Sequence, residues 1–375
     1  MVETKEKSMK KIVIDARELR TSTGRYVERL LNYLQEVDTD RSHRYVVLLK
    51  PEDIEGWKPK SKRFTPVACK YKEFSFGEQI GFLWQLYRLR PDLVHFGMTQ
   101  QPILYLGKTI TTIHDLTTVR FRNPSKNRVV FACKQWVYKW VVKIAARKSA
   151  AIITGTEFVK DDLAKFTHKN SRDITVTYEA ADAILVSPEP ISELEDKQFI
   201  MYVGRPLPHK NLDRLITAFA ELQEKNPDLH LVLAGKKDTL YARHERRVKR
   251  DNISNVVFTG FVSEAELRWL YEHCAAYVFP SLSEGFGLPA LEAMMHGAPV
   301  VSSNATCLPE VYGDAAEYFN PFDTDDIAKK INKVLASDTR RKALVLAGKK
   351  QANKYSWKRT AEQTLTVYKQ VLGEK

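Results

Sequence analysis

The sequence predicts an α/β protein of two domains, each built on a parallel β-sheet. Short apolar segments rich in β-branched residues alternate with helical segments along the whole chain, a pattern typical of parallel sheets covered by helices on both faces. The length of 375 residues is enough for two hydrophobic cores. An acidic, turn-rich segment around 183–197, with Ser187-Pro188-Glu189-Pro190 inside it, interrupts the alternation and predicts a linker.

The elements are predicted in chain order. The first half has strands at 11–16, 45–49, 64–67, 93–96, 109–113, 151–154 and 174–178. A helix at 25–36 follows the first strand, because its apolar residues have helical spacing. The second half has strands at 199–203, 229–234, 256–258, 276–279 and 299–302, with helices at 211–225, 264–273, 288–296 and 356–372. Ligands of such sheets bind beyond the carboxyl ends of the strands, so we expect the two domains to face one cleft.

Composition narrows the possible functions. Neither a membrane-spanning run nor the apolar core of a signal peptide is found, and the four cysteines lack paired spacing. These features predict a cytoplasmic protein in a reducing compartment without a zinc site. The formal net charge of +13 predicts an acidic partner: nucleic acid, anionic lipid or a phosphorylated substrate.

The segment 280–293 carries the strongest chemical signal. A buried strand precedes it, and a helix begins at about Pro289, which suits a first helical position. Gly285 and Gly287 allow backbone amides to approach a ligand, and a helix N-terminus attracts anions. Glu284 and Glu292 flank this turn, and carboxylates beside a phosphate site suit the hydroxyl groups of a ligand. A ligand with a phosphate between two sets of hydroxyls is a nucleotide-sugar. The alternative is a solvated loop glutamate and a glutamate favoured by the helix dipole.

A second segment, 202–211, ends another predicted strand with two cations. Arg205 offers a planar fork and Lys210 a point charge, which together suit a diphosphate. The alternative is two solvated loop cations.

These segments together resemble the retaining GT-B glycosyltransferases grouped as family 4. The pattern at 284–293 reads E-G-F-G-L-P-A-L-E-A, and H-G-A-P-V-V-S-S at 296–303 and L-P-E-V at 308–311 continue it. The spacing of Arg205 and Lys210 also follows that family. The resemblance runs from Ile12 to about Tyr368, and T-G-R-Y, I-H-D-L and L-P-E-V-Y-G-D-A-A are similar to the bacterial mannosyltransferase-B-like branch.

The resemblance implies the GT-B architecture, two Rossmann-like domains facing a central cleft. Residues 1–185 would form the acceptor-side domain, to which the C-terminal helix at 356–375 returns, and 186–355 the nucleotide-sugar domain. It implies transfer of a hexose, with retention, from a nucleoside-diphosphate sugar to a hydroxyl of a glycan or lipid-linked acceptor. No metal and no cofactor are expected, and Asp38-Thr39-Asp40 and Asp323-Thr324-Asp325 are not interpreted as a metal site. GDP-mannose is the favoured donor, followed by UDP-glucose.

The resemblance also assigns roles to residues. Catalytic roles are expected for His114, Glu284, Arg205 and Lys210: His114 faces the transferred sugar, with Asp115 orienting it or its loop, and the two cations hold the diphosphate. Glu284 would bind the sugar hydroxyls and Glu292 the ribose. The other expected donor-binding residues line the phosphates and the base: Gly24, Phe261, Val262, Gly285, Phe286, Gly287 and Leu288.

Two rival functions remain at this stage. A nucleotide-sugar epimerase shares the two-domain architecture, but would need a second acid or base beside His114. A nucleic-acid-binding protein would explain the charge and leave the motifs unexplained.

The excess charge is concentrated at 120–148, where no acidic residue occurs. The basic residues are Arg120, Arg122, Lys126, Arg128, Lys134, Lys139, Lys143, Arg147 and Lys148, interleaved with aromatic residues. Helical spacing predicts that one face packs on the first domain, through Val130, Cys133, Val137, Val141 and Ile144. The opposite face is either solvated or docks peripherally on an anionic membrane, with Trp136 and Trp140 at the interface. In the second case the protein would sit on the inner face of the cell membrane.

Overall fold

The chain folds into two α/β units. The computed structural model describes residues 9–21, 24–122 and 128–374. Unit 1 comprises Met1–Leu116, Lys134–Glu179 and Ser356–Lys375, and unit 2 comprises Thr117–Cys133 and Ala180–Tyr355. Compared with the boundaries expected from sequence, residues 117–133 and 180–185 group with the second unit.

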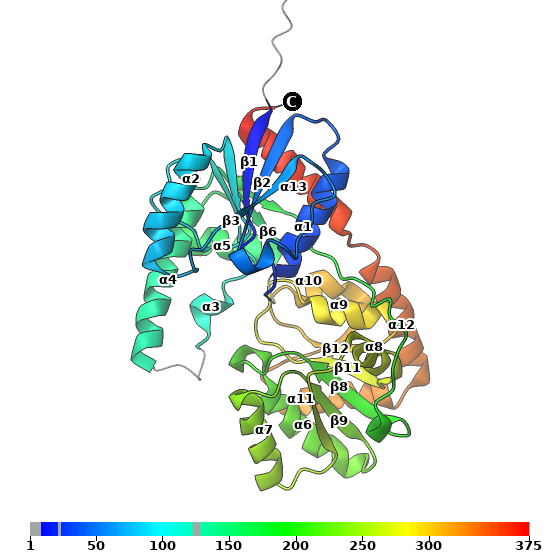
Figure 1. Cartoon of the computed structure of the whole chain (residues 1–375). Helices are drawn as coiled ribbons and strands as arrows, with labels where there is room; N and C mark the ends of the chain where they lie inside the picture. Colours follow the sequence, from blue (N-terminus) through cyan, green and yellow to red (C-terminus); the bar gives the residue numbers. More distant parts are fainter. Residues whose placement is uncertain (1–8, 22–23, 123–127, 375) are drawn as a thin grey trace, which may run out of the picture. The chain divides into compact units, whose positions relative to one another are not determined.

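Unit 1 is built on a seven-stranded parallel sheet with the order β3-β2-β1-β4-β5-β6-β7 (Figure 1). Its strands are β1 (Lys10–Asp15), β2 (His43–Leu49), β3 (Phe64–Ala68), β4 (Leu93–Phe96), β5 (Thr109–Thr112), β6 (Ala151–Thr154) and β7 (Ile174–Val176). Strands are added on one side of β1 and then, from β4 onward, on the other. The strand order therefore reverses between β1 and β4, where Asp15 lies opposite Phe96.

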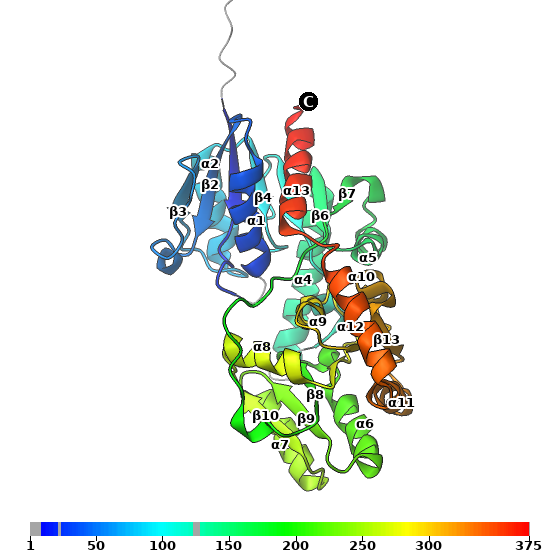
Figure 2. The ribbon, with the colours of Figure 1, turned by 90° about the vertical axis from the view of Figure 1, so that its right-hand side faces the viewer.

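Helices cover this sheet. They are α1 (Gly24–Val37), α2 (Leu83–Leu89), α4 (Arg128–Lys148), α5 (Glu157–Thr167) and α13 (Trp357–Leu372), with the short η1 (Pro51–Asp53), η2 (Glu78–Phe82) and η3 (Ser171–Asp173). The C-terminal helix α13 returns to unit 1 and packs beside α1, as expected from sequence (Figure 2). Tyr368 of α13 is fully buried, and its hydroxyl lies 2.6 Å from His95 Nδ1 of β4.

The packed face of α4 differs from the sequence-based prediction. Cys133 and Val137 are exposed, whereas Val142, Ala145 and Ala146 are buried and Val141 and Ile144 are half-buried. The side chain of Val130 lies outside the described residues. The reason is that the C-terminal end of α4 is fixed to the sheet: Ser149 Oγ lies 2.8 Å from Thr111 Oγ1. Burial therefore follows the last turns of the helix rather than one stripe along its whole length.

Unit 2 is built on a six-stranded parallel sheet with the order β10-β9-β8-β11-β12-β13, and the order reverses between β8 and β11. Its strands are β8 (Phe199–Val203), β9 (His230–Ala234), β10 (Val256–Gly260), β11 (Ala276–Phe279), β12 (Val300–Ser303) and β13 (Ala316–Phe319). Its helices are α3 (Thr117–Arg120), α6 (Leu212–Lys225), α7 (Thr239–Arg250), α8 (Glu264–His273), α9 (Leu288–Met295), α10 (Leu308–Tyr312), α11 (Thr324–Leu335) and α12 (Asp338–Ala352), with η4 (Ser192–Leu194), η5 (Pro208–Lys210) and η6 (Gly313–Ala315).

The two sheets have the same kind of core. The central strands of both units are almost entirely buried and rich in apolar residues, as expected for strands covered on both faces. The buried polar residues of unit 1 include His95 of β4 and the three threonines of β5. In the described part of the chain, no helix combines the length and the hydropathy needed to span a bilayer.

Candidate functional site

An ion pair marks the point in unit 2 where the strand order reverses. Lys210 ends the loop after β8, and Glu284 lies in the loop after β11. Lys210 Nζ donates to Glu284 Oε1 at 2.6 Å, and the two side chains are only 20% and 13% exposed. In open α/β sheets the crevice at such a reversal is the usual ligand site. Each charge compensates the other in a place that burial would otherwise make costly.

A buried asparagine holds these loops together. Asn211, directly after Lys210, has a left-handed backbone with φ of 61° and is the N-cap residue of α6. Its Nδ2 donates to Pro280 O at 3.1 Å and to Pro321 O at 2.7 Å. Asn211 thus joins the loops that follow β8, β11 and β13, and it fixes the backbone from which Lys210 projects.

The glycine turn after Glu284 is fixed by close packing. Gly287 has φ of 97°, and Tyr312 Oη donates to its carbonyl oxygen at 2.7 Å. A Cβ at this position would lie 2.1 Å from the same Tyr312 oxygen. Only glycine therefore fits, both for its backbone conformation and for its lack of a side chain. Phe286, between the two glycines, is buried.

The helix after this turn begins where sequence predicted. Leu288 and Pro289 occupy the first turn of α9, and within the described residues no side chain caps its N-terminus. The positive end of the helix dipole therefore lies beside the glycine turn. Glu292, one turn further on, is buried. Glu284, Gly285, Gly287, Leu288 and Glu292 thus belong to one strand–turn–helix segment.

Arg205 lies apart from the Lys210–Glu284 pair. Its side chain is 60% exposed, and its Nε donates to Asp238 Oδ2 at 3.1 Å. Asp238 follows β9 and caps α7 by accepting from the amides of Leu240 and Tyr241. Burial alone would raise the Asp238 pKa, but these amides and Arg205 outweigh it and the pKa is lowered. Arg205 therefore extends from the loop after β8 to the loop after β9, at the same edge of the sheet, and most of its side chain is exposed.

The two predicted residues after β10 occupy the next loop along that edge. The side chain of Phe261 is exposed and that of Val262 is half-buried. The strand ends at Gly260, whose φ is 81°. The loops after β8, β9, β10 and β11 therefore all contribute residues to the carboxyl edge of the unit 2 sheet.

In unit 1, His114 follows β5 and binds two acceptors. Its Nδ1 lies 2.9 Å from Glu179 Oε1, and its Nε2 lies 3.1 Å from Gly97 O. Carboxylate and carbonyl oxygens only accept, so both ring nitrogens must carry hydrogen and the imidazole is charged. Burial alone would lower the His114 pKa, but Glu179 and the other acceptors outweigh it and raise the pKa. In this state His114 supplies positive charge and cannot act as a base.

Glu179 is the functional residue that sequence reasoning missed. It lies three residues beyond β7 and 65 residues from His114 in the chain. The carboxylate that contacts the imidazole at 2.9 Å is that of Glu179, and Asp115 also helps to raise the His114 pKa through its charge. A glutamate just beyond a predicted strand was the available signal.

Gly24 begins α1 in unit 1. Its amide donates to Thr21 O at 3.0 Å, and a Cβ there would lie 2.1 Å from Glu18 O. The close contact of Gly24 with the backbone of Glu18 and Leu19 is thus one reason for glycine at this position.

In residues 9–21, 24–122 and 128–374, no group of three His, Cys, Asp or Glu side chains is placed to hold a metal ion. The aspartates of the two D-x-D spellings have structural contacts. Asp38 is buried and accepts from Tyr45 Oη at 2.6 Å, and Asp323 caps α11.

Comparison with known proteins agrees with this geometry. Residues 186–351 match the family model described as glycosyl transferases group 1. The chain is 31% identical to the O-antigen chain mannosyltransferase B of Escherichia coli over 284 residues, which cover 70% of this chain and 71% of that protein.

Solved structures show the same fold. Sucrose-phosphate synthase from Thermosynechococcus elongatus has a TM-score of 0.77 at 18% identity, covering 97% of this chain and 99% of that one. HepE of Anabaena, solved in complex with UDP and glucose, has a TM-score of 0.70 at 17% identity over 96% of this chain and 99% of that one. At these identities the likeness shows the fold, two parallel-sheet α/β domains of GT-B type.

Proposed function

This chain belongs to the glycosyl transferases group 1 family, and we propose that it moves a mannose- or glucose-type hexose from a nucleoside-diphosphate sugar to a hydroxyl of a glycan or lipid-linked acceptor. The observation that carries the proposal is the Lys210–Glu284 pair at the reversal of the unit 2 sheet, followed directly by the glycine turn and α9. A carboxylate can accept hydrogen bonds from hydroxyls, and an ammonium group and a helix N-terminus can bind phosphate. Their presence in one place therefore suits a ligand that has both hydroxyls and phosphates.

Lys210 and Glu284 are proposed to bind different parts of the donor. Lys210, Arg205 and the N-terminus of α9 stabilise the diphosphate, while Glu284 accepts from sugar hydroxyls and Glu292 from the ribose. On binding, the anionic diphosphate competes with Glu284 for Lys210. Glu284 then becomes available to the sugar, so the ion pair acts as a preformed pair of binding groups.

The proposed reaction balances without a protein nucleophile. The bond between the anomeric carbon and the diphosphate oxygen breaks, and a bond to the acceptor oxygen forms on the same face of the sugar. The acceptor proton passes to the leaving diphosphate. Lys210 and Arg205 stabilise the charge that builds on the departing group, and this electrostatic effect is the main catalytic contribution of the protein. The charged His114 is proposed to face the transferred sugar.

The donor is proposed to be GDP-mannose, because the relative with 31% identity is named a mannosyltransferase. A nucleotide-release assay with GDP-mannose and UDP-glucose, with and without EDTA, tests this choice. GDP release that depends on an acceptor and persists in EDTA is expected. Product analysis then separates transfer from the rival reaction, since an epimerase would return an altered nucleotide-sugar and no glycoside.

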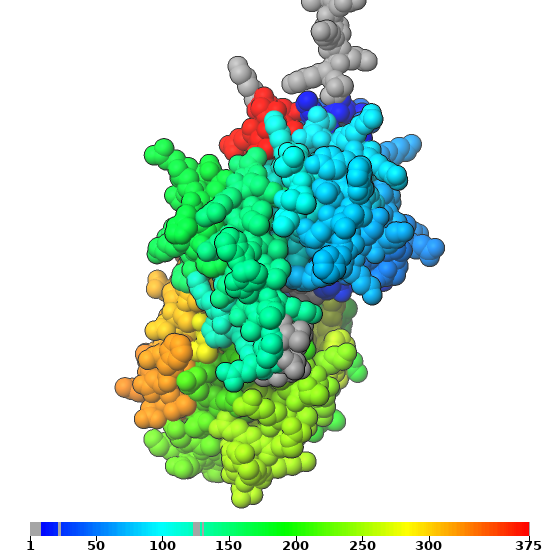
Figure 3. All heavy atoms as spheres, turned by 90° about the vertical axis from the view of Figure 1, so that its left-hand side faces the viewer, coloured from blue at the N-terminus to red at the C-terminus, as the bar shows by residue number. Residues whose placement is uncertain are grey.

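We also propose that unit 1 docks on an anionic membrane through α4. Trp136 and Trp140 are 64% and 50% exposed and lie edge-to-face, with ring centroids 6.1 Å apart. Tyr138 of α4 contacts Phe74, and the segments that contain α2 and α4 lie side by side on the face of unit 1 seen in Figure 3. Phe74, Ile80 of η2 and Trp84 of α2 are exposed. Lys134 and Arg147 are exposed on α4, while Lys143 packs over the Phe166 ring. Exposed indole rings beside cations suit a lipid interface. Residues 123–127 of the segment lie outside the described residues.

A further inference from the structure

Helix α7 of unit 2 carries a row of arginine side chains along one face. Arg243, Arg246, Arg247 and Arg250 follow the spacing i, i+3, i+4, i+7, which places them on the same side of the helix. These four residues, here called the arginine face, line a cavity of about 540 Å³. A cavity of this volume admits a small ligand, and a lining of guanidinium groups selects an anionic one.

Two of these arginines are held in place by the neighbouring helix α6 (Figure 1). Asp213 of α6 accepts from Arg247 Nη1 at 3.2 Å and from Arg243 Nη2 at 3.4 Å. Arg247 also donates through Nη2 to Thr217 Oγ1 at 2.6 Å. His244, followed by Arg243 and Arg247, lowers the pKa of Asp213 to about 2 against the effect of burial, so this carboxylate is charged at neutral pH. A ligand therefore meets guanidinium groups that are already ordered, and less conformational entropy is lost on binding.

The outer arginines keep unused donors. Arg243 and Arg250 are 62% and 74% exposed, and Arg250 uses Nε and Nη2 to bind Asp251. Arg246 is exposed and has no hydrogen bond or ion pair with any residue that the structure describes. Four arginines thus face two carboxylates, those of Asp213 and Asp251, and the cavity keeps an excess of positive charge.

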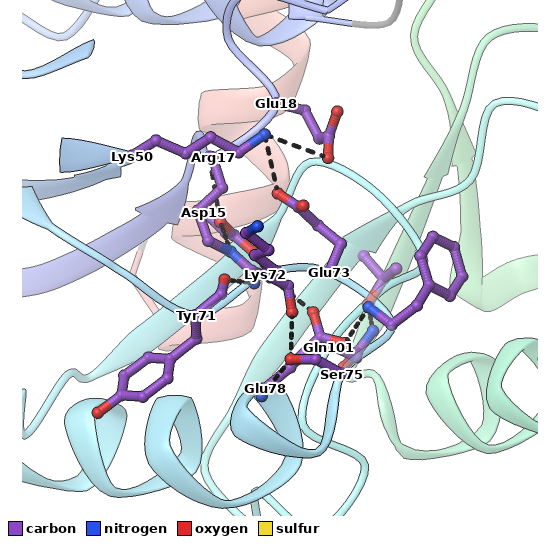
Figure 4. Close-up of polar contacts among 12 residues, drawn as sticks. Asp15, Arg17, Glu18, Lys50, Tyr71, Lys72, Glu73, Ser75, Glu78 and Gln101 are labelled. Carbon is purple, nitrogen blue, oxygen red and sulfur yellow. Dashed lines mark hydrogen bonds and ion pairs between the residues drawn. The ribbon is translucent and has the colours of Figure 1, made fainter. Parts of the chain in front are cut away.

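The buried arginine of unit 1 shows the opposite arrangement (Figure 4). Each of the three nitrogens of Arg17 donates to a protein acceptor: Nε to Asp15 at 2.8 Å, Nη2 to Asp15 and Glu78 at 2.7 and 2.9 Å, and Nη1 to Tyr71 O at 2.9 Å. Its cluster has two cations, Arg17 and Lys50, and four carboxyl groups, those of Asp15, Glu18, Glu73 and Glu78. Arg17 therefore has a structural role. On α7 the excess of charge has the opposite sign, and donors are left for a ligand.

The apolar residues of α7 narrow the choice of anion. Leu240, Tyr241 and Val248 are buried, and among the residues of α7, all of which the structure describes, no large apolar side chain is exposed. Helix α4, by contrast, exposes Trp136 and Trp140. Membrane-docking helices insert apolar side chains, and single-stranded nucleic acid stacks its bases on aromatic rings. The arginine face offers neither, so it favours a soluble anion.

We propose that the arginine face of α7 binds a soluble linear polyphosphate, a chain of successive phosphate groups. Phosphate oxygens match the planar fork of a guanidinium, which binds them with two parallel hydrogen bonds. Arg243 and Arg250 are two helical turns apart, about 10 Å along the axis. A single phosphate cannot reach both, whereas successive phosphates can.

This site is separate from the proposed donor site. Arg205 contacts Asp238, the N-cap residue of α7, and Arg246 lies about 12 Å further along the helix. A nucleotide-sugar held by Lys210 and Arg205 does not need the arginine face. The inference is therefore independent of the proposed function.

Calorimetric titration of the full chain with inorganic triphosphate tests the proposal. The variant is Arg246→Gln, and Lys249→Gln is the matched control, because Lys249 is also exposed on α7 but does not line the cavity. Loss of charge-assisted hydrogen bonds predicts about tenfold to hundredfold weaker triphosphate binding in Arg246→Gln. Lys249→Gln should stay near the wild-type affinity. Inorganic phosphate should bind the wild type more weakly than triphosphate.

Triphosphate also suits the proposed donor site, so the same comparison is made with Lys210→Ala as the parent chain. The loss of affinity caused by Arg246→Gln should persist there. If triphosphate affinity falls in Lys210→Ala and is unchanged in Arg246→Gln, the ligand binds at the donor site, which would overturn the present proposal and support the proposed function. Triphosphate binding through Arg246 in a chain that transfers no sugar would sustain the arginine face and refute the proposed function.

Other results would also overturn the proposal. Equal losses in Arg246→Gln and Lys249→Gln would mean general attraction to a basic surface. Equal affinity for phosphate and triphosphate would exclude a site that spans successive phosphates. Absence of triphosphate binding to the wild type would exclude the ligand, and binding of a short single-stranded DNA or of anionic vesicles through Arg246 in that case would assign the face to a macromolecule.

Discussion

Lys210 and Glu284 lie 74 residues apart in the chain, and their side chains meet at 2.6 Å at the reversal of the unit 2 sheet. This contact resolves an apparent conflict in the sequence, where acidic residues flank a segment suited to phosphate. The Glu284 carboxylate does not repel the ligand, because Lys210 compensates its charge until the diphosphate binds to Lys210.

Removal of either glutamate should separate sugar contacts from nucleotide contacts. Glu284→Ala is expected to slow sugar transfer roughly tenfold to a hundredfold, a loss of about 1.5–3 kcal/mol. It should leave GDP affinity unchanged or improved, since Lys210 is released. Glu292→Ala should weaken both, because ribose is present in both ligands. Calorimetry with GDP beside steady-state kinetics checks this, and equal losses of GDP affinity in the two variants would refute the division of roles.

Glu179→Gln should remove the stabilisation of the charged His114. The His114 pKa is raised above its ordinary 6.5, so its contribution to stability is fully present below that value. The contribution is lost as pH rises through the folded-state pKa. The variant should therefore lose stability mainly under acidic conditions, by about 1.4 kcal/mol per unit of lost pKa shift, and converge with the wild type at high pH.

Urea unfolding from pH 5.5 to 9 checks this pH dependence. His43 also has a raised pKa, so the readout is the difference between variant and wild type. A difference that is independent of pH, or that grows with pH, would contradict the charged state of His114.

Gly287→Ala should be strongly destabilising. The methyl group would meet Tyr312 Oη at 2.1 Å, and φ is 97°, so we expect a loss of about 3 kcal/mol or more in unfolding free energy. Gly373→Ala is the control, since Gly373 has φ of 75° with open space around it. That change should cost about 1–2 kcal/mol, the backbone effect alone. Equal losses in thermal or urea unfolding would show that the Tyr312 contact does not constrain the turn.

The membrane proposal predicts salt-sensitive co-sedimentation with liposomes. Each cation near an anionic leaflet contributes about 1 kcal/mol, so several together give reversible attachment. Binding should require anionic lipid, fall with added salt, and drop when Lys139, Lys143 and Arg147 are changed to Glu.

A matched variant controls for net charge in this experiment. Arg246, Lys249 and Arg250 are exposed on α7 of unit 2, and their change to Glu alters the charge by the same amount. This variant should still bind. Loss of binding in it, or equal wild-type binding to neutral vesicles, would contradict docking through α4.

Much of the fold follows from local pattern. The predicted strand at 276–279 coincides with β11, and that at 11–16 is offset by one residue from β1. Unit 2 elements with weak apolar periodicity were not predicted. Strand β13 carries Glu317, a buried charge that Lys333 and Arg340 compensate from α11 and α12. Helix α7 is rich in basic residues and has few apolar ones, so the helical spacing of its apolar residues is hard to recognise in the sequence.

Within the site, residue types could be predicted but their pairings could not. Arg205 and Lys210 were expected to act together, yet Arg205 pairs with Asp238 one strand away. Contacts of this kind join loops far apart in sequence, so only the sheet order brings them together. The packed face of α4 was wrong because its apolar residues occur on all sides and several helical stripes fit them equally well.

The most direct test of the donor site is transfer of labelled mannose from GDP-mannose to a mannoside acceptor by the wild type, Lys210→Ala and Arg205→Ala. Lys225→Ala, an exposed lysine at the end of α6, is the control. The account predicts transfer by the wild type and the control. It predicts kcat/KM lowered roughly tenfold to a hundredfold in Lys210→Ala, and a clear loss in Arg205→Ala with the fold intact. Transfer by Lys210→Ala at the wild-type rate would contradict the assignment of the diphosphate to this ion pair.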